Sequence, residues 1–201
     1  RPSPTRAAHV LEDLDGRIDM VIDAGPTRVG VESTVLDLTQ HPPVVLRPGA
    51  VTIEALRTIV AGVVSRAPGA AAGGAMPSPG LLPRHYAPRT PMSLYEGDPA
   101  TARERLRRAL REALAAGRRV GVLATREQAD GLRDLPVVIA ELGSERDAEQ
   151  VAGRLYAALR ELDAAQLDVI LAPDFPHEDG LWRALRDRLH RAAAHIVGSR
   201  R

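Results

Sequence analysis

The hydrophobic pattern of this chain changes along its length, and the change predicts two differently built regions. Apolar positions at 29–38 and 44–46 are separated by the turn-forming sequence TQHPP, which predicts two paired strands in a hairpin. Helical spacing predicts helices over 3–16 and 52–64, and a short apolar run predicts a strand at 18–22. The N-terminal region, 1–66, is therefore predicted to be a small α/β unit.

The rest of the chain alternates apolar strands with amphipathic helices. Residues 67–91 are rich in Pro and Gly without a sustained period, which predicts a linker. Strands such as VGVLA and DVILA are apolar throughout, which is typical of parallel strands covered on both faces. We therefore expect a Rossmann-like domain over 92–201, with strands at 91–95, 119–124, 137–142 and 168–172 and helices at 99–116, 127–132, 147–164 and 181–195.

Composition excludes several classes of protein. The net charge is +1, so no overall field favours nucleic acid. All 27 basic residues are Arg, and the lack of Lys excludes P-loop phosphate binding and Schiff-base chemistry. No GxGxxG follows a predicted strand, so dinucleotide binding is not supported. The chain has no Cys, which excludes thiol chemistry and fits a reducing compartment, with the cytoplasm as the expected location.

Two polar residues in the predicted hairpin suggest a binding site. Ser33 shares a strand face with valines, so its hydroxyl needs a partner. Arg47 ends the second strand before Pro48, and a positively charged side chain held on such a fixed backbone suits phosphate. A structural explanation stays open for both: Ser33 bonds to a nearby backbone group, and Arg47 pairs with Asp37 or Glu32.

Two further candidates lie outside the hairpin. Ser3 precedes the first predicted helix, where it either caps the helix, at about 1 kcal/mol, or helps a helix N-terminus bind an anion. Arg84, His85 and Tyr86 stand together in the linker of a chain that is only 2% aromatic. Tyr86 either docks the linker onto a domain surface or contacts a ligand.

Several motifs in the same order resemble one known family. VGVESTVLDL, LRPG and RHYAP, preceded by SPTRAAHVLEDLDGRIDMVIDAG, resemble the Sua5 branch of the Sua5/YciO/YrdC family, the L-threonylcarbamoyladenylate synthases. The resemblance is close over 1–91 and looser beyond. It implies a partial YrdC-like α/β domain at 1–66, a linker at 67–91, and a small Rossmann-like Sua5 domain with a mainly parallel sheet at 92–201.

The resemblance also implies a nucleotidyltransferase reaction. L-threonine, bicarbonate and ATP form threonylcarbamoyl-AMP and pyrophosphate, and the product goes to tRNA threonylcarbamoyl-transfer machinery that modifies adenosine 37. It implies that Ser3, Arg47 and Tyr86 contact ATP and that Ser33 binds L-threonine. Mg²⁺ is expected with the ATP phosphates. The chemistry requires no covalent nucleophile, so no catalytic residue is assigned.

The family's upstream Lys-x-Arg and Ser-x-Asn motifs have no counterpart here, so we expect a C-terminal portion that does not make threonylcarbamoyl-AMP alone. The alternatives are a non-catalytic nucleotide- or RNA-binding regulatory module and an inactive fragment. The arginine-rich stretch 103–111 could bind RNA, but Leu106 and Leu110 on one side indicate an ordinary amphipathic helix. The six His residues show no HxxxH or HExxH spacing, so no metal site is predicted.

Overall fold

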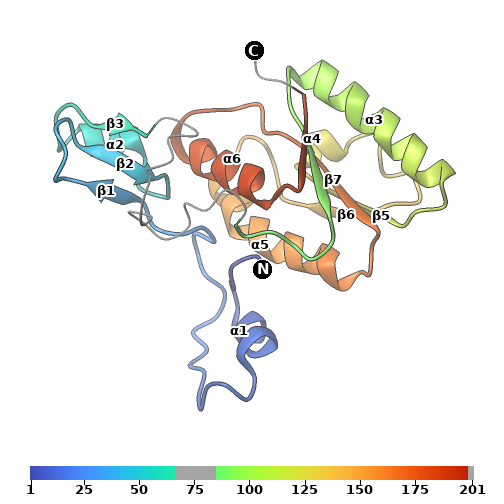
Figure 1. Cartoon of the computed structure of the whole chain (residues 1–201), viewed down its shortest axis with the longest axis horizontal. Helices are drawn as coiled ribbons and strands as arrows, with labels where there is room; N and C mark the ends of the chain where they lie inside the picture. The colour runs from blue at the N-terminus through green and yellow to red at the C-terminus, as the bar shows by residue number, and fades with distance from the viewer. Residues whose placement is uncertain (67–84, 199–201) are drawn as a thin grey trace.

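The computed structural model describes residues 1–66 and 85–198, which form a three-stranded and a five-stranded sheet (Figure 1). In the smaller sheet, β1 (Val35–Asp37) pairs antiparallel with β2 (Val44–Arg47), and β2 pairs parallel with β3 (Val64–Ser65). The N-terminal region also contains two helices, α1 (Ala7–Leu14) and α2 (Ile53–Arg57), and only α2 lies beside this sheet (Figure 1). No helix in the described ranges is long and apolar enough to cross a membrane.

The larger sheet has the order β6-β5-β7-β4-β8, and its strand pairs are parallel. This confirms the predicted α/β class with a mainly parallel sheet. Its elements follow one another along the chain as β4 (Met92–Tyr95), α3 (Pro99–Ala115), β5 (Val120–Ala124), α4 (Arg126–Ala129), β6 (Val138–Glu141), α5 (Ala148–Ala164), β7 (Val169–Pro173), α6 (Gly180–Ala192) and β8 (His195–Val197).

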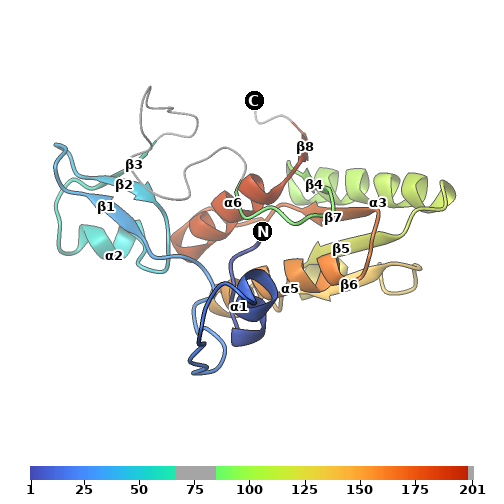
Figure 2. The same ribbon diagram turned by 60° about the horizontal axis from the view of Figure 1, so that its bottom comes forward.

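Helices cover both faces of the five-stranded sheet, which explains why its central strands are apolar throughout. Alternate residues of β7 point to opposite faces: Val169 and Leu171 pack in the cluster that contains α3, while Ile170 and Ala172 pack in the cluster that contains α5 and α6. The helix α6 lies on the side of this sheet that faces the three-stranded sheet (Figures 1 and 2).

Part of the strand structure predicted for the N-terminal region is not formed. Residues 18–22 form no strand, and the large exposures of Met20 (79%) and Ile22 (87%) show that no described layer covers this run. The hairpin strand begins only at Val35, because residues 29–34 pair with no strand in the described structure. An apolar run forms a strand only where a partner strand and a covering layer are present.

Helix ends account for the other errors. The helix predicted over 52–64 ends at Arg57, and the chain then forms the unpredicted strand β3. The helix predicted over 181–195 ends at Ala192, and β8 pairs with β4 at the edge of the sheet. Ile196 of β8 is half exposed, so the strand has neither the length nor the apolar pattern that makes a strand recognisable in sequence.

The N-terminal segment is attached to α5 by one buried cation. Arg160 donates through Nε and Nη2 to the carbonyl oxygen of Pro2, at 3.0 and 2.7 Å, and it also pairs with Asp13 and with Glu12 at 3.1 Å. The N-terminus accordingly lies beside α5 in both views (Figures 1 and 2). Truncating Arg160 would leave the Pro2 carbonyl and both carboxylates without this partner, so the position of α1 depends on it.

This ion pair predicts a pH-dependent contribution to stability. The hydrogen bond and charge of Arg160 lower the pKa of Asp13 from its ordinary value of 3.8. A carboxylate with a lowered folded-state pKa stabilises the fold above its unfolded pKa, and the effect disappears as the pH falls through the folded pKa. We expect Asp13→Asn to lower the melting temperature at pH 7 by about 2–4 °C, the effect of roughly 1 kcal/mol in a chain of this size.

Melting curves of both proteins between pH 7 and pH 2.5 measure this contribution. The difference between them should shrink as the pH falls below about 4, the region of the unfolded aspartate pKa. Asp15→Asn is the matched control, because Asp15 is exposed and lies two residues away. A difference that stays constant over the whole pH range would show that the charge of Asp13 is not what stabilises the fold.

Candidate functional site

The carboxylate of Glu32 lies where three parts of the chain meet. The Ser3 hydroxyl donates to its Oε1 at 2.5 Å, while the Tyr156 hydroxyl and Arg188 Nε donate to its Oε2 at 2.9 and 2.8 Å. Ser3 belongs to the N-terminal segment, Tyr156 to α5 and Arg188 to α6. Glu32 therefore joins the segment that leads into β1 to two helices of the five-stranded domain.

Arg188 extends these contacts to the hairpin and to the end of the linker. Its side chain is fully buried (0% exposed), and its Nη2 donates to the carbonyl oxygen of Pro48 at 3.0 Å. Its Nη1 pairs with Asp187 at 2.6 Å, and its Cζ lies 5.3 Å from the centroid of the Tyr86 ring. A guanidinium at this distance from an aromatic face is attracted by the ring's quadrupole.

Tyr86 is buried under this guanidinium in an unusual backbone conformation. Its φ of 61° lies in the left-handed region, which a residue with a bulky side chain adopts only when its surroundings hold it there. Its ring centroid lies 5.4 Å from that of Tyr156 and 3.9 Å from that of His85. The Tyr86 hydroxyl also has a side-chain hydrogen bond with Arg47. The end of the linker is thus attached to the β1–β2 hairpin.

Arg47 itself connects the hairpin to the segment that contains Ser33. Its Nε donates to the Ser33 carbonyl oxygen at 3.0 Å. Gly49 permits this approach, because a Cβ there would lie 2.4 Å from the Thr34 nitrogen and 2.6 Å from the Glu32 carbonyl oxygen. The turn after β2 and residues 32–34 are therefore in direct backbone contact.

Burial and charge fix the ionisation states of the cluster. Burial alone would raise the pKa of Glu32, but hydrogen bonds from Ser3 and Arg188 and the charge of Arg188 outweigh it, so the pKa lies below its ordinary value. Burial, followed by the negative charge of Glu32, raises the pKa of Tyr156 far above its ordinary value. At neutral pH Glu32 is therefore an anion, Tyr156 is a neutral donor, and Arg188 supplies the balancing positive charge.

The sequence candidates are brought together in part. Ser3 contacts Glu32, Arg47 contacts both Ser33 and Tyr86, and Tyr86 lies against Arg188. Of the two alternatives for Ser3, the helix cap is wrong, because α1 begins at Ala7 after the N-cap residue Arg6, which makes no side-chain cap hydrogen bond. Ser3 instead reaches Glu32, far along the chain.

The expected surroundings of Ser33 also differ from those observed. Its side chain is exposed rather than set among buried valines, because residues 29–34 are not part of a sheet. This exposure leaves the Ser33 hydroxyl accessible to a ligand. Of the two candidates beside Tyr86 in the linker, Arg84 lies outside the described residues, whereas His85 is described.

Sequence reasoning missed Tyr156 and Arg188, which lie 124 and 156 residues from Glu32. One signal for Arg188 was present in the sequence. It follows Leu181 by seven residues and Leu185 by three, so it shares the apolar face of α6 and would be a charge on a buried stripe. A charged residue on a buried stripe needs a partner, but nothing local in the sequence identifies that partner as Glu32.

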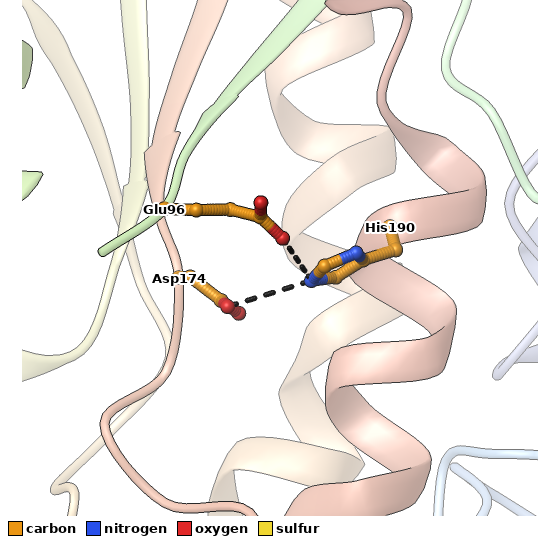
Figure 3. Close-up of side chains that lie close together, drawn as sticks. All are labelled: Glu96, Asp174 and His190. Atoms are coloured by element: carbon orange, nitrogen blue, oxygen red, sulfur yellow. Dashed lines mark hydrogen bonds and ion pairs between the residues drawn. The ribbon is translucent and has the colours of Figure 1, made fainter. Parts of the chain in front are cut away.

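A second polar cluster lies at the carboxyl ends of β4 and β7 (Figure 3). His190 Nε2 lies 3.1 Å from Glu96 Oε1 and 3.4 Å from Asp174 Oδ2, and such a group of side chains could hold a metal ion. Arg186 already pairs with Asp174 at 2.5 Å, however, and a divalent cation would have to compete with this positive charge. The arrangement is best described as an ionic network that connects α6 to the sheet.

Comparison with known proteins identifies both parts of the chain. The family model described as "Threonylcarbamoyl-AMP synthase, C-terminal domain" matches residues 51–194. The Sua5/YciO/YrdC model, described as "Telomere recombination", matches residues 1–49. Threonylcarbamoyl-AMP synthase of Bacillus subtilis is 42% identical over 96% of this chain and 54% of the relative. That of Pyrococcus abyssi is 38% identical over 98% of this chain and 56% of the relative.

Solved structures show the same similarity. The crystal structure of P. abyssi Sua5 complexed with L-threonine matches with a TM-score of 0.86 and 36% identity, over 100% of this chain and 57% of that chain. A P. abyssi Sua5 variant with a His and the following Tyr both replaced by Ala matches with a TM-score of 0.84 and 36% identity, over 98% and 55% of the two chains. The chain thus spans about half the length of the relatives that it matches. The family models, the relatives and the shared fold together show that it belongs to the Sua5 family of threonylcarbamoyl-AMP synthases.

Proposed function

We propose that this chain supplies part of a threonylcarbamoyl-AMP synthase, which joins L-threonine, bicarbonate and ATP into threonylcarbamoyl-AMP and pyrophosphate. Its relatives carry this enzyme's name, and one structural neighbour was crystallised with L-threonine. The observation that carries the proposal is the convergence of Arg47, Ser33 and Tyr86 from the hairpin, the preceding segment and the end of the linker. These are residues that the family resemblance independently assigns to L-threonine and ATP.

The geometry suggests how these residues divide the task. The reaction requires a carbamate oxygen held against the α-phosphate while positive charge offsets the phosphates. Arg47 donates to the Ser33 backbone, so the proposed phosphate contact lies beside the proposed threonine contact. The exposed Ser33 hydroxyl is then available to L-threonine, and the planar guanidinium of Arg47 suits phosphate oxygens.

Ser3 and Tyr86 line two other sides of the proposed nucleotide site. Ser3 is positioned by Glu32, and Tyr86 closes over Arg188 from the linker. His85 and Tyr86 are the only adjacent His–Tyr pair in this sequence, and we assign them to the pair replaced by Ala in the P. abyssi variant. A role of the linker as a cover over the nucleotide would act through this pair.

Further expectations accompany this function: the metal ion follows from the chemistry of ATP, the downstream partner from the family resemblance, and the location from the lack of Cys. Mg²⁺ accompanies the ATP phosphates, the product passes to tRNA threonylcarbamoyl-transfer machinery, and the reaction takes place in the cytoplasm. Direct RNA binding by α3 is not favoured. Leu106 and Leu110 of α3 are buried, and the exposed side carries ion pairs such as Arg108 with Glu112 at 3.7 Å, which is typical of a solvated helix.

Pyrophosphate release from ATP tests the proposal directly. We expect release that depends on both L-threonine and bicarbonate from a protein that joins this chain to the upstream part of the family's catalytic region. We expect none from the 201-residue chain alone, because Arg47 by itself does not replace the upstream cations that would stabilise the transition state. Reactions without threonine and without bicarbonate are the controls. Release that is independent of L-threonine would contradict the proposed function.

Arg47 provides a test of the ATP contact. In the same joined protein, Arg47→Ala should raise the ATP dissociation constant by about 10- to 100-fold, the scale of losing a charge-assisted hydrogen bond. Arg47→Lys should have a smaller effect, since an ammonium keeps the charge but not the bidentate fork. Calorimetric titration measures both.

Arg57→Ala is the matched control for this titration. Arg57 also donates through Nε to a backbone carbonyl, that of Val63 at 2.8 Å, but it lies on α2 away from Ser33. Equal losses of ATP affinity in the Arg47 and Arg57 variants would remove Arg47 from the nucleotide site.

A further inference from the structure

We propose that Arg188 is a positioning residue, through which helix α6 of the five-stranded domain sets the geometry of the threonine and ATP contacts. This inference rests on the function proposed above and adds to it a reason for the second domain. The site residues come from the N-terminal region and the linker, whereas the group that aligns them comes from the far end of the chain.

The guanidinium of Arg188 contacts three different parts of the proposed site. Arg188 donates to Glu32 through Nε at 2.8 Å and to the Pro48 carbonyl through Nη2 at 3.0 Å, and its Cζ lies 5.3 Å from the Tyr86 ring centroid. Each partner stands beside a proposed ligand contact or is one itself. Glu32 precedes Ser33, Pro48 follows Arg47, and Tyr86 is the proposed cover.

Because the Arg188 side chain is buried, it depends on its contact with Glu32. Arg188 is fully buried, so it stays charged in this position only while a carboxylate and hydrogen-bond acceptors surround it. Tyr156 donates to the same Glu32 oxygen and prevents the carboxylate from turning away. A lysine would keep the charge, but its compact ammonium would not provide the planar fork that reaches Glu32 and Pro48 while lying near the Tyr86 ring.

The close backbone packing transmits any displacement to the site. Because a Cβ at Gly49 would clash with the backbone of residues 32–34, the turn that carries Arg47 is in direct backbone contact with the segment that carries Ser33. Loss of Arg188 would release both the turn and Tyr86. A misplacement of about 1 Å in a site that works by positioning is enough to reduce the rate about 100-fold.

The test compares Arg188→Met with Arg186→Met in the joined protein described above. Arg186 lies on the same helix and is also ion-paired, but its partners Asp174 and Glu178 belong to the five-stranded domain. We expect Arg188→Met to lower kcat for threonine-dependent pyrophosphate release by about 100-fold, and Arg186→Met to lower it by less than about threefold. Arg188→Lys should recover only a small part of the loss.

A double variant separates positioning from simple stability. Arg188→Met leaves the Glu32 carboxylate without its cation, whereas adding Glu32→Gln removes that uncompensated charge. We expect the double variant to recover most of the lost melting temperature and little of the lost kcat, because Pro48 and Tyr86 still lack their partner. A kcat within about threefold of the unmodified protein in Arg188→Met, or recovery of kcat together with the melting temperature, would overturn the proposal.

Hydrogen exchange in the 201-residue chain gives a readout that needs no activity. We expect Arg188→Met, but not Arg186→Met, to accelerate amide exchange at residues 85–91, which include the Tyr86 backbone. If the joined protein releases no threonine-dependent pyrophosphate, the proposed function fails, and this exchange measurement alone decides the positioning role. Equal exchange in the two variants would then overturn it.

Discussion

The buried charge of Arg188 is the constraint on which the arrangement of this molecule depends. A guanidinium without solvent is tolerable only if the chain delivers a carboxylate and further acceptors to it. The structure satisfies that requirement with Asp187 on α6 itself and with Glu32 and the Pro48 carbonyl from the N-terminal region. The need to pair this one side chain of α6 thus determines where the N-terminal part of the chain lies against the second domain. Apolar packing alone would determine that position less precisely.

The sequence predicted the five-stranded domain well because its signals are local. Its central strands are apolar throughout, and its helices carry apolar stripes that the structure places on the sheet, such as Leu106 and Leu110 of α3. The N-terminal region was predicted less well because a strand forms there only where another part of the chain pairs with it, as β3 does with β2. Residues 18–22 have the composition of a strand, but no strand among the described residues pairs with them, and composition does not reveal this difference.

The same distinction between local and long-range signals applies to the residues of the candidate site. Ser33, Arg47 and Tyr86 lie in short motifs that were recognisable as motifs, and the structure brings Arg47 into contact with the other two. Tyr156 and Arg188 belong to no motif, and their roles arise only when two helices meet a segment far earlier in the chain. Ser3 combines a local and a long-range signal. Its proximity to a helix suggested a cap, whereas its actual partner is the distant Glu32.

Gly30 shows how the two halves keep their relative position. A Cβ at this residue would lie 2.3 Å from the carbonyl oxygen of Ala152 on α5, so the two main chains touch without any intervening side chain. Its φ of 74° also suits glycine better than any other residue. Any residue other than glycine at position 30 would therefore have to push the segment that leads into β1 away from α5, and with it the Glu32 carboxylate away from Tyr156 and Arg188.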